Sequence, residues 1–410
     1  MSVLSPSQHF VAEQELHLLD VSIVMPCLNE IISLPHCIAN AQAALDRISA
    51  EYGLTGEIVI ADNGSTDGSQ ALARSLGARV VPVAERGYGA ALIGGCRGAA
   101  GHYILMGDCD GSYNFLDGVA MIGRLEEGAD ICMGSRFQGG IEPGAMPWKN
   151  RYIGNPVLTG ILNLFFRSGI SDAHCGLRAI TKDAFHSLRL TGSGMEFASE
   201  MVIKAALKKL RMDEVPATLS HDLRDRAPHL RPWRDGWRHL RYLMMLSPRW
   251  IFGIPGVAAC FFGLTMLAMA ISDALLPGTF PAVGNYWTIL GAAALSTGHM
   301  ALILAISAQL YGTRQGYRLM TNRSRWLVER LSLEKLLGMG ALLGASGIAT
   351  LAMVFWQWTE RDYGAIYTIL PAVLGTTLIT LGLQTGMAGF LLAILGGNIA
   401  RFRDFPAEGR

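Results

Sequence analysis

The chain has 410 residues, of which 50% are hydrophobic and only 16% charged, and its formal net charge is +1. A charged fraction well below the roughly 25% of soluble domains excludes an ordinary soluble protein, and a near-neutral chain offers no overall basic charge for nucleic acid. The length allows two or three domains. Most charged residues precede Trp250, and most long apolar runs follow it.

Seven cysteines are present without a C-x-x-C pair, which favours free thiols in a reducing compartment. The first 20 residues predict a weakly ordered or amphipathic lead-in, and they contain no apolar run typical of a signal peptide.

Beyond that lead-in, short apolar runs alternate with helical stretches as far as about residue 135. The expected strands are residues 21–25, 57–61, 79–84, 103–106 and 130–133, and helices are expected at about 31–50 and 90–100. This alternation predicts a mainly parallel sheet covered by helices on both faces. Ligands of such sheets bind beyond the carboxyl ends of the strands. A further helix is expected after residue 66, capped by Ser65 or Thr66, with Asp67 in its first turn.

The fourth expected strand leads into two carboxylates, in the stretch HYILMGDCDGSYNF at residues 102–115. Because residues two apart on an extended chain point the same way, Asp108 and Asp110 are expected to aim at one point. Hard oxygen ligands of this kind suit Mg²⁺ or Mn²⁺, with substrate phosphates filling other positions. The alternative interpretation is a polar turn after a strand.

Other polar residues fall at the ends of neighbouring strands. Asp62 ends the second strand and can accept a hydrogen bond from a base or ribose. Arg136 ends the fifth strand, where its planar donor fork can face a phosphate or form a salt bridge at the rim of the sheet. Arg86 and Gly87 lie in a Gly-x-Gly turn before the helical stretch at 90–100, which is either a phosphate-facing turn or a plain helix start.

Four motifs in this order resemble family 2 glycosyltransferases with the GT-A fold. They are Pro26 with Asn29 and Glu30, DNGSTDG at residues 62–68, DCDGSY at 108–113, and GSR at 134–136. Within that family the chain looks most like the dolichyl- and polyprenyl-phosphate hexose synthases, over roughly residues 20–250.

The resemblance implies roles for particular residues. Nucleotide-binding residues are expected to be Pro26, Asn29, Glu30, Asp62, Arg86 and Gly87. Asp108 and Asp110 are expected to hold the metal and the diphosphate. Arg136 and Arg151 are expected to bind donor and acceptor phosphates, and Arg224 and Arg226 to assist with the acceptor phosphate.

The sequence departs from the family pattern in two places. Many family 2 enzymes with hydroxyl acceptors carry a Glu-Asp pair whose Asp is the general base, whereas the nearest stretch here contains Glu196 and Glu200 without such a pair. A lipid phosphate is largely dianionic at pH 7 and needs no strong base, so the missing pair favours a phosphate acceptor. The two glutamates can also simply favour a helix N-terminus. A Gly-Ser-Lys loop found in many polyprenyl-phosphate enzymes is replaced by residues 224–231, so the acceptor contacts stay open.

The second half of the chain predicts membrane association. Residues 231–242 mix Arg with Trp and Tyr, which predicts a helix in the membrane interface, with binding of single-stranded nucleic acid as the alternative. Four apolar stretches follow at about 250–276, 286–311, 336–358 and 365–396, each long enough to cross a bilayer. Lys and Arg are concentrated in residues 313–335, so the positive-inside rule places that loop, both termini and the catalytic domain in the cytoplasm of a bacterial-type inner or plasma membrane. Two G-x-x-x-G patterns, at 340–344 and 382–386, are either helix-packing sites within or between chains, or incidental.

The expected organisation is an N-terminal lead-in (1–20), a GT-A domain (21–222), a juxtamembrane amphipathic region (223–249), a four-helix transmembrane domain (250–400) and a cytoplasmic tail (401–410). We predict an inverting, metal-dependent transfer of a hexose from a nucleotide sugar, of the UDP-glucose or GDP-mannose type, to a polyprenyl phosphate. The expected partners are the donor, the lipid and the membrane, with a homo-oligomer open and no nucleic acid. The alternatives are a glycosyltransferase acting on a hydroxyl-bearing lipid or a polysaccharide, and a non-enzymatic transport component.

Overall fold

The computed structural model describes residues 19–224, 232–278, 284–322, 325–326, 330–366 and 368–396. The chain divides into two compact units, Met1–Leu246 and Ser247–Arg410. Residues 1–18 of the expected lead-in, the tail and Arg226 lie outside the described residues.

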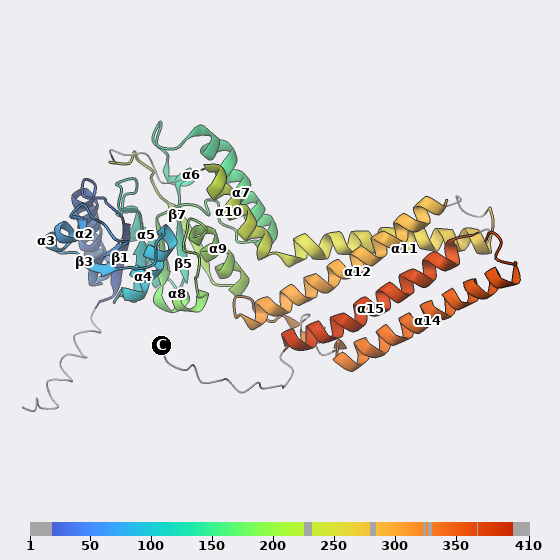
Figure 1. Cartoon of the computed structure of the whole chain (residues 1–410). Helices are drawn as coiled ribbons and strands as arrows, with labels where there is room; N and C mark the ends of the chain where they lie inside the picture. Colours follow the sequence, from blue (N-terminus) through green and yellow to red (C-terminus); the bar gives the residue numbers. More distant parts are fainter. Residues whose placement is uncertain are drawn as a thin grey trace, which may run out of the picture. The chain divides into compact units, whose positions relative to one another are not determined.

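The first unit is built on a seven-stranded sheet with the strand order β3-β2-β1-β4-β6-β5-β7 (Figure 1). Strands β3, β2, β1 and β4 pair in parallel, as do β5 and β7, and β6 runs antiparallel between β4 and β5. The predicted mainly parallel sheet is therefore confirmed. The strands are β1 (Val21–Cys27), β2 (Gly56–Asp62), β3 (Arg79–Pro82), β4 (Tyr103–Met106), β5 (Ile131–Ser135), β6 (Arg178–Thr181) and β7 (Met212–Pro216).

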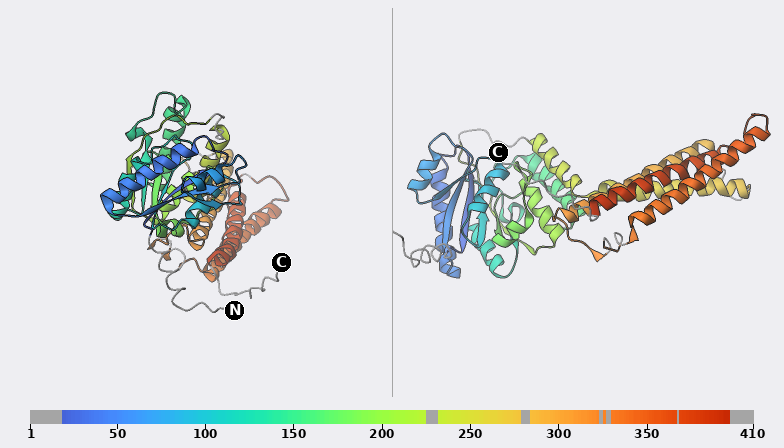
Figure 2. Two further views of the ribbon diagram at one scale, coloured as in Figure 1. Left: turned by 90° about the vertical axis from the view of Figure 1, so that its left-hand side faces the viewer. Right: turned by 60° about the horizontal axis from the view of Figure 1, so that its bottom comes forward.

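Helices cover both faces of this sheet (Figures 1 and 2). The α2 and α5 helices pack on one face, and α4 and α9 pack together on the other. The helical segments of this unit are α2 (Leu34–Tyr52), α3 (Ser69–Ser75), α4 (Tyr88–Gly98), α5 (Asp117–Glu126), α6 (Arg136–Gly139), η2 (Asn150–Gly154), α7 (Asn155–Phe166), α8 (Lys182–Leu188), α9 (Phe197–Lys208) and α10 (Pro232–Met245).

The prediction for the start of α3 was wrong. Its N-cap is Gly68, in the left-handed region at φ 92°, and neither Ser65 nor Thr66 caps it. Ser65 instead donates its backbone N–H to Asp62, and Thr66 donates its own to Asn29. These residues are used to join loops at the carboxyl ends of β1 and β2.

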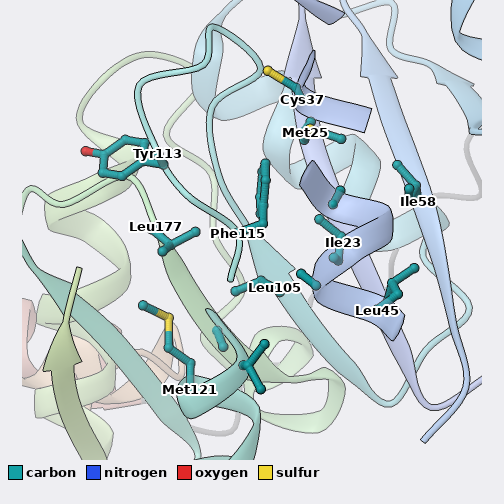
Figure 3. Packing of buried hydrophobic residues seen from close by; sticks show 14 of the residues in the cluster. Ile23, Met25, Cys37, Leu45, Ile58, Leu105, Tyr113, Phe115, Met121 and Leu177 are labelled. Carbon is teal, nitrogen blue, oxygen red and sulfur yellow. The ribbon is translucent and has the colours of Figure 1, made fainter. Parts of the chain in front are cut away.

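Alternation along β1 fixes which face of the sheet forms the main core. Ile23 and Met25 point into the cluster beneath α2 and α5, where they meet Leu105 and Phe115 (Figure 3). On the opposite face, α4 approaches so closely that a Cβ on Gly95 would lie 2.7 Å from a methyl group of Val24. The sheet is thus closely packed on both faces, and the loops at its carboxyl ends start from this packed core.

The second unit contains the four expected apolar helices, each long and apolar enough to cross a membrane. They are α11 (Ile254–Leu275), preceded by η3 (Arg249–Gly253), then α12 (Asn285–Arg314), α14 (Leu333–Glu360) and α15 (Leu370–Gly396). They lie side by side in the order α11, α12, α15, α14 (Figures 1 and 2).

Glycines hold these helices together in two pairs. A Cβ on Gly340 would lie 2.6 Å from the carbonyl oxygen of Gly382, and one on Gly382 would lie 2.7 Å from the backbone nitrogen of Gly344. Gly256 and Gly298 face each other in the same way in the α11–α12 pair. The two G-x-x-x-G patterns are therefore packing sites within this chain, because a side chain at Gly340 or Gly382 would separate the two backbones.

Candidate functional site

The loops that follow β1 and β2 are joined by hydrogen bonds at the carboxyl end of the sheet. Asp62 is 2% exposed and accepts from the backbone N–H groups of Gly64 and Ser65. Asn29 accepts from Thr66 N at 2.8 Å, and Glu30 N donates to Ser69 Oγ at 3.2 Å. Predicted nucleotide residues from two motifs thus share one rim, with Asn29 exposed and Pro26 half-buried beside it.

The turn with Arg86 and Gly87 belongs to the same rim. Gly87 N donates to Asn63 Oδ1 at 2.8 Å, and the exposed Arg86 donates to the carbonyl oxygen of Asn63. Gly87 has φ 137°, and a Cβ there would lie 2.1 Å from the carbonyl oxygen of Ser193. Glycine is required at this position by the close approach of the Ser193 backbone, and the hydrogen bonds to Asn63 hold the turn next to the loop carrying Asp62.

Asp108 lies half-buried after β4. Burial raises the pKa of its carboxyl to about 6, and the neighbouring Asp110 carboxylate adds to the rise. The Tyr88 hydroxyl, hydrogen-bonded to Asp108, and the guanidinium groups of Arg224 and Arg178 oppose it. A Cβ on Gly176 would lie 2.8 Å from Asp108 Oδ2, so the carboxylate stands against bare backbone on that side.

Asp110 is 7% exposed and is the centre of a second cluster. Its Oδ1 accepts from the backbone nitrogen and hydroxyl of Ser112 at 3.0 and 2.6 Å. Its Oδ2 lies 3.0 Å from Arg224 Nη2, and Arg224 Nε lies 2.9 Å from Glu30 Oε1. The structure therefore brings Glu30, Asp110 and Arg224 together, with Asp108 next to them.

This donor set fits a divalent metal. Carboxylate oxygens suit Mg²⁺ or Mn²⁺, and Asp108 and Asp110 supply two carboxylates close enough for the charge of one to raise the pKa of the other. Within the described ranges, no group of three or more His, Cys, Asp or Glu side chains is arranged to hold a metal alone. The remaining ligands would thus have to be phosphate oxygens and water, as is usual for Mg²⁺.

Arg136 is bound to a carboxylate that the sequence did not reveal. Its Nε and Nη2 lie 2.7 and 2.8 Å from the two oxygens of Asp172, and its backbone nitrogen donates to the same side chain. Asp172 is fully buried. The salt-bridge alternative is thus present, and Nη1 is the guanidinium nitrogen that the contacts with Asp172 do not use.

Arg151 lies in η2, and its guanidinium stands 5.5 Å from the ring centre of Tyr152. Apolar side chains are exposed on η2 and just before it, among them Trp148 (62%), Tyr152 (68%) and Ile153 (52%). An exposed apolar surface beside a cation is typical of contact with a lipid surface. No described contact joins Arg151 to Asp110 or Arg224.

Residues 232–245 form a helix, as expected for the basic and aromatic segment. It packs on α7 and α9, and His239 reaches Ser199 Oγ on α9 at 2.8 Å. The helix is therefore fixed to the first unit, with Trp237 56% exposed.

One functional candidate was missed from the sequence. Arg178 opens the antiparallel strand β6, is 2% exposed, and opposes Met106 of β4. Its guanidinium donates to the carbonyl oxygens of Cys175 and Ala198, and its charge acts on Asp108. A lone arginine in a four-residue strand gave no signal, because only the antiparallel pairing brings it beside the aspartates.

Glu196 and Glu200 differ in what they contact. Glu200 is fully buried, pairs with Lys204 at 2.6 Å and accepts from the backbone nitrogens of Thr191 and Gly192. Glu196 is the N-cap of α9, with Oε1 accepting from Gly194 N. Its buried Oε2 has no hydrogen-bond partner among the described residues.

A mainly parallel α/β unit with its polar site at the carboxyl ends, combined with four apolar helices, defines a membrane-bound enzyme of the GT-A class. Residues 22–189 match glycosyl transferase family 2, and residues 306–396 match the glycosyltransferase family 2 C-terminal transmembrane region. The chain is 33% identical over 377 residues to the low-salt glycan biosynthesis hexosyltransferase Agl6 of Haloferax volcanii, covering 92% of this chain and 89% of that protein. The chain belongs to glycosyltransferase family 2 and is an integral membrane protein.

Two other proteins show more distant likenesses. A dolichyl-phosphate hexose transferase of Haloferax volcanii is 27% identical over 197 residues, covering 48% of this chain and 81% of that protein. The crystal structure of mannosyl-3-phosphoglycerate synthase from Rubrobacter xylanophilus matches with 21% identity and a TM-score of 0.43, covering 58% of this chain and 77% of that chain. At that TM-score the structural likeness carries no functional argument.

Proposed function

We propose that this glycosyltransferase moves a hexose from a nucleoside diphosphate sugar to a polyprenyl phosphate at the cytoplasmic membrane face, with inversion at the anomeric carbon. The observation that carries the proposal is the cluster of Glu30, Asp108, Asp110 and Arg224 at the carboxyl ends of the sheet. It lies in a chain whose second unit has four helices apolar enough to span a membrane.

Two relatives support the sugar and the acceptor class. One is named a hexosyltransferase, and the other a dolichyl-phosphate hexose transferase. The exposed apolar surface at Trp148, Tyr152 and Ile153 supports an acceptor that sits in lipid, because the surface adjoins Arg151.

In the proposed reaction the loop residues position the donor. Asp62, Asn29 and the turn at Gly87 form the rim for the nucleoside, and Asp108 and Asp110 face its diphosphate. A bound divalent ion would stabilise the negative charge that develops on the leaving diphosphate. In the proposal, Nη1 of Arg136 and the charge of Arg178, which acts on Asp108, do the same from the protein side.

The acceptor needs orientation more than activation. A phosphate monoester is largely dianionic at pH 7, so its oxygen attacks the anomeric carbon without a strong general base. Arg151 and Arg224 hold that phosphate in the proposal. The spans would hold the enzyme in the membrane that contains the lipid acceptor, which favours their encounter.

The test uses the purified full chain in proteoliposomes containing polyprenyl phosphate, with radiolabelled UDP-glucose and GDP-mannose in separate reactions. We expect one donor to label the lipid extract, the label to be released by mild acid, and Asp110→Asn to lower the rate at least a hundredfold. Labelling by Asp110→Asn at the wild-type rate would refute the role of Asp110.

Transfer to a hydroxyl-bearing lipid is the second candidate, and one observation favours it. Glu196 Oε2 is buried without a hydrogen-bond partner among the described residues, as a general base awaiting a hydroxyl would be. An acid-stable product that disappears in Glu196→Gln would select this candidate, whereas an acid-labile product formed by both proteins would exclude it.

A further inference from the structure

Arg224 is held by two separate loops at once. Its side chain is 17% exposed and forms ion pairs with Glu30 after β1 and with Asp110 after β4. The backbone leading to it is also fixed, because Leu223 N donates to Asp110 O at 2.8 Å and Ser220 N donates to Ser112 O at 2.9 Å. The guanidinium is therefore held in the carboxylate cluster both by its ion pairs and by the backbone hydrogen bonds of the residues before it.

The contact involves the same oxygen that a metal would need. Asp110 Oδ1 already accepts two hydrogen bonds from Ser112, so Oδ2 is the oxygen best placed to ligate an ion. That oxygen is the one that lies 3.0 Å from Arg224 Nη2. A divalent cation on Oδ2 would stand within a few ångströms of the guanidinium, and like charges at that range repel strongly in a partly buried site.

We propose that Arg224 is a resident cation that competes with the divalent ion for Asp110, and that binding of the metal with the donor diphosphate releases it. The released guanidinium then carries its charge to the anionic acceptor phosphate, so the acceptor binds productively only after the donor. Arg224 keeps its ion pair with Glu30 while its guanidinium leaves Asp110, because that pair does not involve Asp110 Oδ2. This inference rests on the proposed function of Asp108 and Asp110.

The first test measures Mn²⁺ binding to the full chain in detergent by electron paramagnetic resonance, without nucleotide. Arg224→Gln removes the competing charge, and we expect it to bind Mn²⁺ about tenfold more tightly than the wild type. Arg224→Lys keeps a cation and should bind as the wild type does. Arg47→Gln is the matched control, because Arg47 pairs with Glu51 at the other end of α2 and its loss changes net charge equally.

The second readout follows Arg224 itself. Phenylglyoxal modification of the wild type, mapped by mass spectrometry, should be slow at Arg224 and at least fivefold faster with Mn²⁺ and UDP or GDP together. Arg136, held by Asp172, should react slowly in both states.

The outcomes distinguish a failure of the competition by Arg224 from a failure of the proposed metal site at Asp110. If Arg224→Gln binds Mn²⁺ no more tightly than the wild type, or if Arg224→Lys gains as much affinity, competition by Arg224 is refuted while metal use stands. If Asp110→Asn binds Mn²⁺ as the wild type does, the metal assignment itself is wrong and the inference falls with it.

Discussion

The ion pair between Arg136 and Asp172 allows a structural role to be separated from a role in phosphate binding. Asp172 is fully buried and Arg136 is 8% exposed, so Asp172→Asn would leave a buried guanidinium without its counter-charge. Removing one partner of a buried pair costs about 3–5 kcal/mol. Asparagine keeps the shape and some hydrogen bonding, so the cost should fall near the lower figure.

In a domain of 150–250 residues, 1 kcal/mol shifts Tm by about 2–4 °C, so Asp172→Asn should lower the Tm of the first unit by about 6–12 °C. The assay is thermal unfolding of the full chain in detergent, followed by near-UV circular dichroism. Glu127→Gln is the control, since its pair with Arg124 is exposed and should shift Tm by about 2 °C or less.

Adding Arg136→Met to Asp172→Asn removes the unpaired charge. We expect most of the lost stability to return, because a buried pair can often be replaced by apolar groups at little cost. Transfer activity should not return if the Nη1 edge also binds the diphosphate. A Tm for Asp172→Asn within 2 °C of the wild type would refute the reasoning, because the carboxylate would then not be neutralising Arg136.

Three further predictions concern other parts of the chain. Burial raises the pKa of Glu200, but hydrogen bonds and charge from Lys204 outweigh it and hold that pKa below its ordinary value of 4.5. The ionised Glu200 therefore stabilises the fold above that value, and this stabilisation is lost as pH falls. Glu200→Gln should flatten the fall in Tm between pH 6 and 3, and an unchanged slope would contradict this. Gly382→Leu should separate α15 from α14 at Gly340 and lower the yield of folded protein in detergent, as measured by size-exclusion chromatography, whereas Gly338→Leu, in open space, should not. Replacing exposed Trp148 by Ser should raise KM for lipid acceptor severalfold while leaving kcat and donor KM unchanged, and a raised donor KM would point to a different role.

The parts of the fold that the sequence predicted are those governed by local pattern. The run at residues 103–106 is apolar, short and bounded by glycine, and it forms β4 with the expected bounds. The four apolar stretches form α11, α12, α14 and α15, because their length and composition suit helices that span a membrane. Hydrophobic periodicity is a property of neighbouring residues, so it can be read without knowing the topology.

What the sequence did not predict are partnerships between distant loops. Asp172 lies far along the chain from Arg136, and no local pattern connects them. Arg224 was expected to contact a phosphate, but its position on Glu30 and Asp110 depends on how the segment before it pairs with Ser112. The predicted cap at Ser65 or Thr66 failed for the same reason, since those residues are used to join two loops.

The spacing of the glycines in the second unit shows that a structural element is repeated there. Four glycines of α11 and α12 (256, 263, 291 and 298) recur at one constant offset along the chain in α14 and α15 (340, 347, 375 and 382). The equivalent glycines pack in the same way. A Cβ added to Gly263 would lie 2.5 Å from the carbonyl oxygen of Gly291, and one added to Gly347 would lie 2.6 Å from that of Gly375.

The second unit is therefore one hairpin built twice. The two copies meet through their second helices, α12 and α15. At that seam His299 bonds Gln384 Oε1 at 2.9 Å and lies 3.4 Å from the Thr385 hydroxyl. Close glycine packing thus forms each hairpin, because lipid gives helices no hydrophobic drive to associate. The hairpins meet through this polar contact and through an apolar cluster of Leu310, Leu336 and Leu392.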